Sequence, residues 1–345
     1  MHMRLRSRWL VAFIAAAAAV LVAAAAYAAT ARTEKVTKIA IATPDKANNY
    51  GWDQQGVTSA KKAAAAEGAS ITVSEGIGYD NTEAVLRQLA TRGAQFIIAQ
   101  ASGFATVAPR IAKQYKVPVV SYDHPEIRSK GLVSDIETSS QDGAYLAGIL
   151  AAKLTKTGIL GIVISAADPN WFKQSGGFAA GARSVNPNVK FRFAQIGQAG
   201  YGDAAGGKRV TQSVIAAGAD IVFGMGDGAS FGMLQAVETA KAGHKVWFID
   251  VIGNKSPLDK KHVLLSSVLW DFTQVFKQAI NDINNGTYGT HIYNLGIANG
   301  ISLLKTKYIP ASVWAAVQKA QKSIASGAIK VPVTPTKAAV DKYIK

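Results

Sequence analysis

A pattern of apolar run, tight turn and helix occurs twice in this 345-residue chain and restricts the possible folds more than any other feature. The first copy is RGAQFIIAQASGF (92–104) and the second is AAGADIVFGMGDGASF (216–231). In each copy Gly-Ala precedes the apolar run. A helical pattern and then a second apolar run follow each copy. This second run ends at Asp123 after the first copy and at Asp250 after the second. One pattern used twice predicts one architecture used twice.

Short β-branched segments alternate with helical patterns along most of the chain. Helical patterns run, for example, from Gly51 to Glu67 and from Thr82 to Arg92. Strands that alternate with helices predict parallel sheets covered by helices on both faces, so the expected fold class is α/β. The segments that we interpret as buried strands are 38–43, 71–76, 95–100, 117–123, 158–166, 189–195, 220–226, 245–250 and 263–270.

The length exceeds that of one typical domain, and we predict two lobes, each a parallel sheet flanked by helices, with a ligand cleft between them. The helical pattern after Trp270 is expected to return to the first lobe, so the chain would cross between lobes more than once. The predicted N-terminal lobe is 32–137 plus about 271–290, the C-terminal lobe is 138–270 plus about 291–330, and 331–345 is a C-terminal tail.

The start of the chain, residues 1–31, is predicted to be a signal peptide. Three arginines precede an apolar run, Trp9–Val22, and small residues suited to cleavage follow in AYA (26–28). The alternative is a retained anchor, because the segment Trp9–Ala29 is just long enough to cross a bilayer. We predict cleavage, and therefore a periplasmic or secreted protein.

Composition excludes several classes of function. The chain has no cysteine, so disulfides, thiol chemistry and a lipid-modified cysteine are excluded. The formal net charge is +16, but the basic residues are spread along the chain, which predicts a generally basic surface and no nucleic-acid partner. P-loop, GxSxG and HExxH motifs are absent, and the five histidines are not spaced as metal ligands. We predict no enzyme activity, no cofactor and no metal.

Ligands of parallel α/β sheets bind beyond the carboxyl ends of the strands, where this sequence places small, aromatic and acidic residues. The small residues at 101–103 allow a sharp turn, after which Phe104 is expected on the rim of the cleft. Aromatic faces can stack on a flat solute, and carboxylates can accept its hydrogen bonds. Taken singly, a strand-end carboxylate is often only a helix cap, and a loop aromatic is often only packing. The predicted ligand-binding residues are Tyr50, Trp52, Phe104, Asp123, Trp171, Asp227, Asp250 and Trp270, and the same loops contain Asp53, Asp168 and Asn170.

Several longer segments resemble the basic membrane protein family of ABC-importer solute-binding proteins, whose characterised members include purine-nucleoside receptors. The resemblance covers most of 36–305 in the same order. It implies the type I periplasmic-binding-protein fold, with a ligand between the lobes whose base stacks on aromatic rings. The segments are YGWDQQG (50–56), YDNTEAVLRQLATRGAQFIIAQASGF (79–104), DGAYLAGILAAKLTKTG (142–158), GARSVNPNV (181–189), SSVLWDF (266–272) and NLGIANGISLL (294–304).

By position, the resemblance assigns stacking to Trp52, with Tyr50 beside it, and to Phe104, and it assigns ligand contacts to Asp250 and Trp270. Three features depart from the family pattern. The first loop reads YGWDQQ where many nucleoside receptors have SFNQ, Ile252 stands where a second aspartate is frequent, and Trp270 stands where lysine is common. The first loop resembles a branch associated with free purine bases.

The leading hypothesis is a monomeric receptor that closes two lobes on a small-molecule solute, a purine base or nucleoside, and delivers it to a membrane permease. Two alternatives remain. The same fold could bind a sugar or another small solute, or the chain could be a secreted nucleoside hydrolase.

Overall fold

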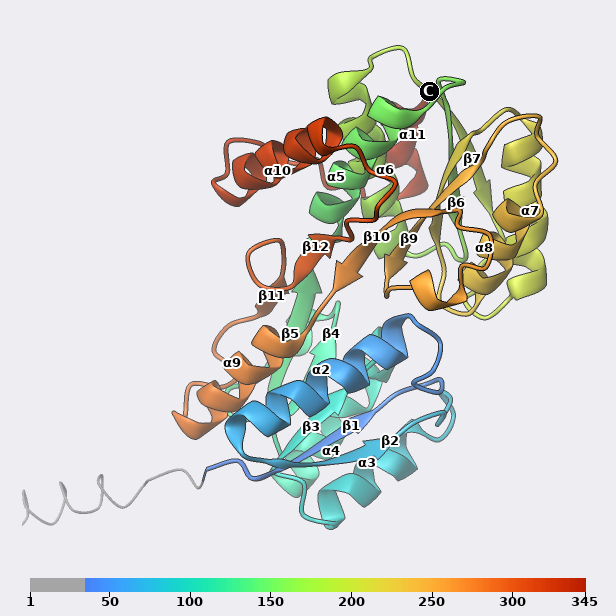
Figure 1. Ribbon diagram of the computed structural model, residues 1–345. Coiled ribbons are helices and arrows are strands. Elements are labelled where there is room, and N and C mark those ends of the chain that lie inside the picture. The colour runs from blue at the N-terminus through green and yellow to red at the C-terminus, as the bar shows by residue number, and fades with distance from the viewer. Residues whose placement is uncertain (1–34) are drawn as a thin grey trace, which may run out of the picture.

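The computed structural model describes residues 35–345, so the predicted signal peptide lies outside the described residues. Two six-stranded sheets, each flanked by helices, lie end to end (Figure 1). All strands run parallel except β12, which pairs antiparallel with β10. The α/β prediction is confirmed.

The first sheet has the order β11-β5-β4-β3-β1-β2. Along β1 the apolar residues alternate between its two faces. Ile39 and Ile41 pack towards α2 and α9, whereas Ala40 and Ala42 pack towards α3 and α4. This alternation follows from the strand period of two and explains why the strand reads as continuously apolar. Its strands are β1 (Lys38–Ala42), β2 (Ser70–Ser74), β3 (Phe96–Ala99), β4 (Val119–Tyr122), β5 (Val133–Thr138) and β11 (Tyr293–Leu295), and its helices are α2 (Trp52–Glu67), α3 (Thr82–Thr91), α4 (Ala108–Tyr115) and α9 (Thr273–Asn284).

The second sheet repeats this arrangement in the order β12-β10-β9-β8-β6-β7. Val163 and Val222 face the helix pair α7 and α8, while Ile162 and Phe223 face the pair α5 and α6. Its strands are β6 (Ile159–Ile164), β7 (Lys190–Gln195), β8 (Ile221–Met225), β9 (Trp247–Ile252), β10 (Leu264–Trp270) and β12 (Ile301–Leu303), and its helices are α5 (Ser140–Leu154), α6 (Pro169–Val185), α7 (Ala204–Ala216) and α8 (Ala229–Glu238).

The chain passes between the sheets three times, from β5 to α5, from β10 to α9 and from β11 to β12 (Figure 1). Of the four strands at these passages, the sequence patterns revealed β10 but not β5, β11 and β12. β5 contains polar residues such as Asp135, and β11 and β12 are each only three residues long. Because β11 pairs with β5, residues 293–295 lie on the first sheet, whereas we predicted that the second lobe resumes near 291.

The C-terminal segment packs on the second lobe. Helix α10 (Ala311–Ala325) contacts α5, and helix α11 (Lys337–Ile344) contacts α6. The guanidinium of Arg183 on α6 donates to the carbonyl oxygens of Tyr343, at 2.7 Å, and Lys345, at 2.9 Å. The predicted tail, 331–345, is therefore docked through charged hydrogen bonds.

Helices α5 and α6 cross so closely that glycine is required at the contact. A Cβ atom on Gly148 would lie 2.0 Å from the carbonyl oxygen of Phe178, and one on Gly181 would lie 2.0 Å from that of Tyr145. Both obstacles are backbone atoms that cannot move aside. These glycines therefore set the distance between the two helices that cover one face of the second sheet.

We predict that Gly181→Ala destabilises the protein, although alanine normally favours a helix over glycine by about 1 kcal/mol. Overpacking at this crossing should lower the free energy of unfolding by about 1–3 kcal/mol. Urea denaturation measures this change. Gly197→Ala is the control, because no atom lies within 4 Å of its added Cβ, and it should leave the midpoint unchanged. Equal midpoints for Gly181→Ala and wild type would contradict the argument.

Candidate ligand-binding site

A cavity of about 140 Å³ lies where the carboxyl ends of both sheets face each other. Every strand from β1 to β4 and from β6 to β10 contributes at least one wall residue from its end or from the loop that follows it. The paired sheets therefore build the site as the strand-end rule predicts. Its walls are formed by Pro44, Asp45, Trp52, Asp53, Tyr79, Ala101, Ser102, Asp123, Asp168, Asn170, Trp171, Tyr201, Asp227, Ile252 and Trp270.

Trp52, the first residue of α2, is held among other aromatic rings. Its ring meets those of Tyr122, Phe272 and Trp270 edge to face, with centroids 4.9, 5.4 and 6.0 Å away. Its indole Nε1 donates to the carbonyl oxygen of Gln100 at 2.7 Å. Packing and this hydrogen bond orient the ring, so Trp52 can offer an apolar surface to a ligand but no polar atom.

Two carboxylates of the cavity connect the lobes. Asp227, after β8, accepts the backbone N–H of Trp52 at 3.0 Å, and Asp123, after β4, accepts from Asn170 Nδ2 at 3.1 Å. Only one oxygen of each carboxylate is used, because Asp123 Oδ2 and Asp227 Oδ2 have no hydrogen-bond partner among residues 35–345. These free oxygens are available to a ligand.

Two further aspartates are held in fixed positions by local hydrogen bonds. Asp53 accepts from the backbone N–H of Asp45 and from Asn49 Nδ2, at 3.1 and 2.7 Å. Asp168 caps α6 through the backbone N–H of Asn170 and also accepts from the hydroxyl of Tyr201 at 2.7 Å. These two carboxylates of the cavity, like those of Asp123 and Asp227, are thus positioned by hydrogen bonds within the protein.

Burial makes ionisation of three of these aspartates unfavourable. It raises the pKa of Asp53 to about 6 and that of Asp123 to about 6. It raises the pKa of Asp227 to about 7, an effect that the nearby Asp53 reinforces and the Trp52 N–H and Lys255 oppose. A carboxylate in a low-dielectric site loses hydration, and like charges around it add to that cost.

Five of the eight predicted residues line the cavity, namely Trp52, Asp123, Trp171, Asp227 and Trp270. Their role in binding stays a prediction. The other three, Tyr50, Phe104 and Asp250, are not part of its wall.

Phe104 lies below the cavity wall rather than on its rim. Its side chain is fully buried and belongs to a cluster with Leu86 and Ile111. The short 3₁₀ turn Ser102–Thr106 returns the chain over the sheet, so the ring packs into the core. Tyr79 covers it, with ring centroids 5.7 Å apart, and reaches the cavity instead.

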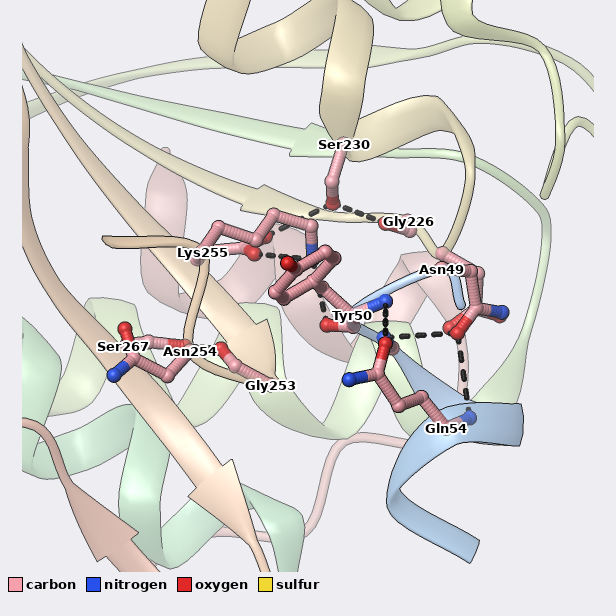
Figure 2. Close-up of polar contacts among 12 residues, drawn as sticks. Asn49, Tyr50, Gln54, Gly226, Ser230, Gly253, Asn254, Lys255 and Ser267 are labelled. Atoms are coloured by element: carbon pink, nitrogen blue, oxygen red, sulfur yellow. Dashed lines mark hydrogen bonds and ion pairs between the residues drawn. The ribbon is translucent and has the colours of Figure 1, made fainter. Parts of the chain in front are cut away.

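Asp250 forms a buried ion pair with Lys255, whose side chain is labelled in Figure 2. Lys255, whose side chain is also fully buried, places Nζ 2.6 Å from Asp250 Oδ2 and donates to the carbonyl oxygen of Tyr50 at 3.0 Å. Ser230 donates to the other carboxylate oxygen at 2.9 Å. Asp250 is therefore satisfied inside the protein, and Tyr50 contributes a backbone contact between the lobes.

Sequence reasoning missed part of the wall. Asp53, Asp168 and Asn170 were noted in the sequence as residues of strand-end segments but were not predicted to bind; they lie at the starts of α2 and α6, and all three line the cavity. Tyr79 and Tyr201 follow the edge strands β2 and β7 by several residues. No local pattern distinguishes these tyrosines from ordinary loop residues.

The raised pKa of Asp227 predicts a pH-dependent stability. In the unfolded chain an aspartate ionises near pH 3.9, so between about pH 4 and 7 the folded state retains a proton that the unfolded state releases. Stability contributed by this group is present below that range and is lost as the pH rises through it. Asp227→Asn should therefore raise the melting temperature of the ligand-free protein more at about pH 8 than at about pH 5.

Asp80→Asn provides the matched control, because this exposed carboxylate lies outside the cavity wall. It should leave the melting temperature unchanged at both pH values. A gain for Asp227→Asn that is the same at both pH values would contradict the assignment.

Among residues 35–345, no helix is long and apolar enough to span a bilayer, and no group of three acidic or histidine side chains is arranged to hold a metal ion.

Comparison with known proteins agrees with this geometry. The family model described as ABC transporter substrate-binding protein PnrA-like matches residues 36–334. An ABC transporter nucleoside-binding protein, BmpA, of Lactococcus lactis is 28% identical over 220 residues, which are 60% of this chain and 62% of that protein. A purine-binding protein of Brucella abortus is 26% identical over 199 residues, 56% of this chain and 55% of that protein. The chain thus aligns with less than two thirds of either relative.

Among solved structures, an ABC transporter solute-binding protein from Conexibacter woesei superposes with a TM-score of 0.73 at 21% identity. The superposition covers 86% of this chain and 99% of that one, so the two share a fold. The chain belongs to the family of PnrA-like ABC transporter substrate-binding proteins, which bind solutes and are not enzymes.

Proposed function

We propose that this protein is the extracytoplasmic receptor of an ABC importer, and that it binds a purine base or nucleoside in the cavity between its lobes. The observation that carries the proposal is a cavity whose walls combine tryptophan and tyrosine rings with aspartates from both sheets. A planar ring system with N–H groups at its edges fits such walls, because its faces stack and its edges donate.

The energetics of this arrangement are adequate for a receptor. One base stacked on an aromatic side chain contributes about 1–3 kcal/mol. A micromolar dissociation constant needs about 8 kcal/mol, so charge-assisted hydrogen bonds must add the rest. The free oxygens of Asp123 and Asp227 can supply them.

The size of the cavity supports a bare base over a nucleoside. Its volume of about 140 Å³ is far below that of a pocket for a drug-sized ligand, about 300–1,000 Å³. A dry engineered cavity of about 150 Å³ accommodates benzene. A fused heterocycle is closer to this scale than a base with a ribose attached.

Ligand binding between the lobes would report occupancy to a permease. Wall residues from both sheets would each gain contacts only when the lobes are together, so a ligand would favour the closed form. The three passages between the lobes are the places where such a movement would bend the chain. We propose a monomer that acts outside the cytoplasm, with a membrane permease as its partner.

The decisive experiment is calorimetric titration of the purified protein with adenine, hypoxanthine and guanine, with their nucleosides, and with ribose and arabinose. We expect heats of binding with at least one purine base or nucleoside and none with the sugars. Binding of a pentose without any purine would reject the proposal. Release of free base from a nucleoside with turnover would also reject it.

Trp52→Ala should weaken binding of that purine by roughly 5- to 150-fold, the equivalent of 1–3 kcal/mol of stacking. Trp314→Ala is the matched control, because Trp314 is also half-buried but lies on α10, away from the cavity. It should bind like the wild type. Unchanged affinity of Trp52→Ala would show that Trp52 does not stack on the ligand.

A further inference from the structure

We propose that the cavity selects neutral or positively charged heterocycles with several N–H donors and rejects anions. The inference deepens the proposed function and rests on it only for the identity of the ring system.

The charges of the cavity wall are all of one sign. Five aspartates contribute, four from the loops that follow β1, β4, β6 and β8 and one from the first turn of α2, and no lysine, arginine or histidine of the described residues is part of the wall. The chain as a whole carries a formal charge of +16. A general attraction for anions at the surface therefore does not extend to the site. The five residues are Asp45, Asp53, Asp123, Asp168 and Asp227.

The two lysines whose charges lower the pKa of Asp123 and Asp227 have carboxylate partners of their own. Lys173, which lies close enough to lower the pKa of Asp123 slightly, pairs with Glu137 at 3.5 Å. Lys255, which has the same effect on Asp227, pairs with Asp250 at 2.6 Å. Both of these positive charges are matched outside the wall, and the wall itself contributes only carboxylates.

The unused hydrogen-bonding atoms specify the ligand further. Asp123 Oδ2 and Asp227 Oδ2, on opposite lobes, are free acceptors. Trp270 is 1% exposed and lines the cavity, and its indole Nε1 is a buried donor without a partner among residues 35–345. That nitrogen is itself shielded from solvent, so the specification of the ligand rests on the two carboxylate oxygens. The complementary solute therefore carries N–H donors on two edges.

An anion would meet a large penalty in this site. Like charges brought together in a partly buried site repel each other strongly, because the low local dielectric screens them poorly. A cation would be attracted by the carboxylates and also by the faces of the tryptophan rings. We therefore expect this cavity to discriminate between planar ligands more strongly by their charge than by their shape.

A pair of probes that differ mainly in charge tests this inference independently of the purine proposal. Benzamidine and benzoate are both planar six-membered rings, one with an amidinium group and the other with a carboxylate. At about pH 7.5, calorimetry or ligand-observed NMR should detect benzamidine at least about tenfold tighter than benzoate. Benzoate binding as tightly as benzamidine would overturn the inference.

A second pair of probes applies the same charge test to purines. Hypoxanthine is neutral near neutral pH, whereas urate is an anion of similar outline. We expect urate to bind at least about 100-fold more weakly. Equal affinities would overturn the charge inference and leave the purine proposal standing. Preference for benzamidine without binding of any purine would support the charge inference and reject the purine proposal.

Substitutions of aspartates test which carboxylates produce the charge selectivity. In the double variant Asp123→Asn, Asp227→Asn, the benzamidine-to-benzoate ratio should fall by about tenfold or more, since two local charges are removed. Asp80→Asn changes the net charge at an exposed position outside the wall and should leave the ratio unchanged. A double variant with the wild-type ratio would contradict the assignment of selectivity to these carboxylates.

Discussion

The whole site depends on one constraint, that two parallel sheets face each other with the carboxyl ends of their strands. Parallel strands deliver all their following loops to one edge, so each sheet contributes a complete set of loops to the same space. Residues as distant in the chain as Trp52 and Trp270 thereby come within 6.0 Å, measured between ring centroids. The repeated strand–turn–helix pattern matters for function because, besides building a covered core, it brings the loops that form the site to one place.

The site is built at the expense of stability. Asp53 and Asp227 are held in surroundings where burial opposes their charge, yet their hydrogen bonds fix them in place. Such preorganised acceptors reduce the cost of orientation when a ligand binds, and the ligand supplies the missing counterpart. Binding sites commonly show this exchange of stability for function. In this protein the same aspartates also make the site acidic although the chain as a whole is basic.

The buried pair of Lys255 and Asp250 has a different role from the carboxylates of the cavity. Breaking such a pair is costly, but forming it adds little net stability, because both groups lose their hydration. Its value lies in geometry, since Lys255 also holds the carbonyl of Tyr50 on the opposite lobe. The loop that presents Trp52 and Asp53 is thus joined to the second sheet. The ammonium of Lys255 therefore positions this loop, and its pairing with Asp250 leaves the net charge of the cavity wall negative.

Local pattern was enough to predict the α/β class, most strands and helices, and the loops that form the site, because hydrophobic period and turn residues are properties of neighbouring positions. It identified Trp52 and Asp227 among the wall residues for the same reason. It could not distinguish Asp250, since the ammonium that neutralises it becomes a neighbour only when the strand end and the following loop pack together. Nor could it place Phe104, because a single turn decides whether a ring faces the cavity or the core. Only the packing of the folded chain determined which of the loop residues remain free to bind, because hydrophobic period does not record which side chains become neighbours.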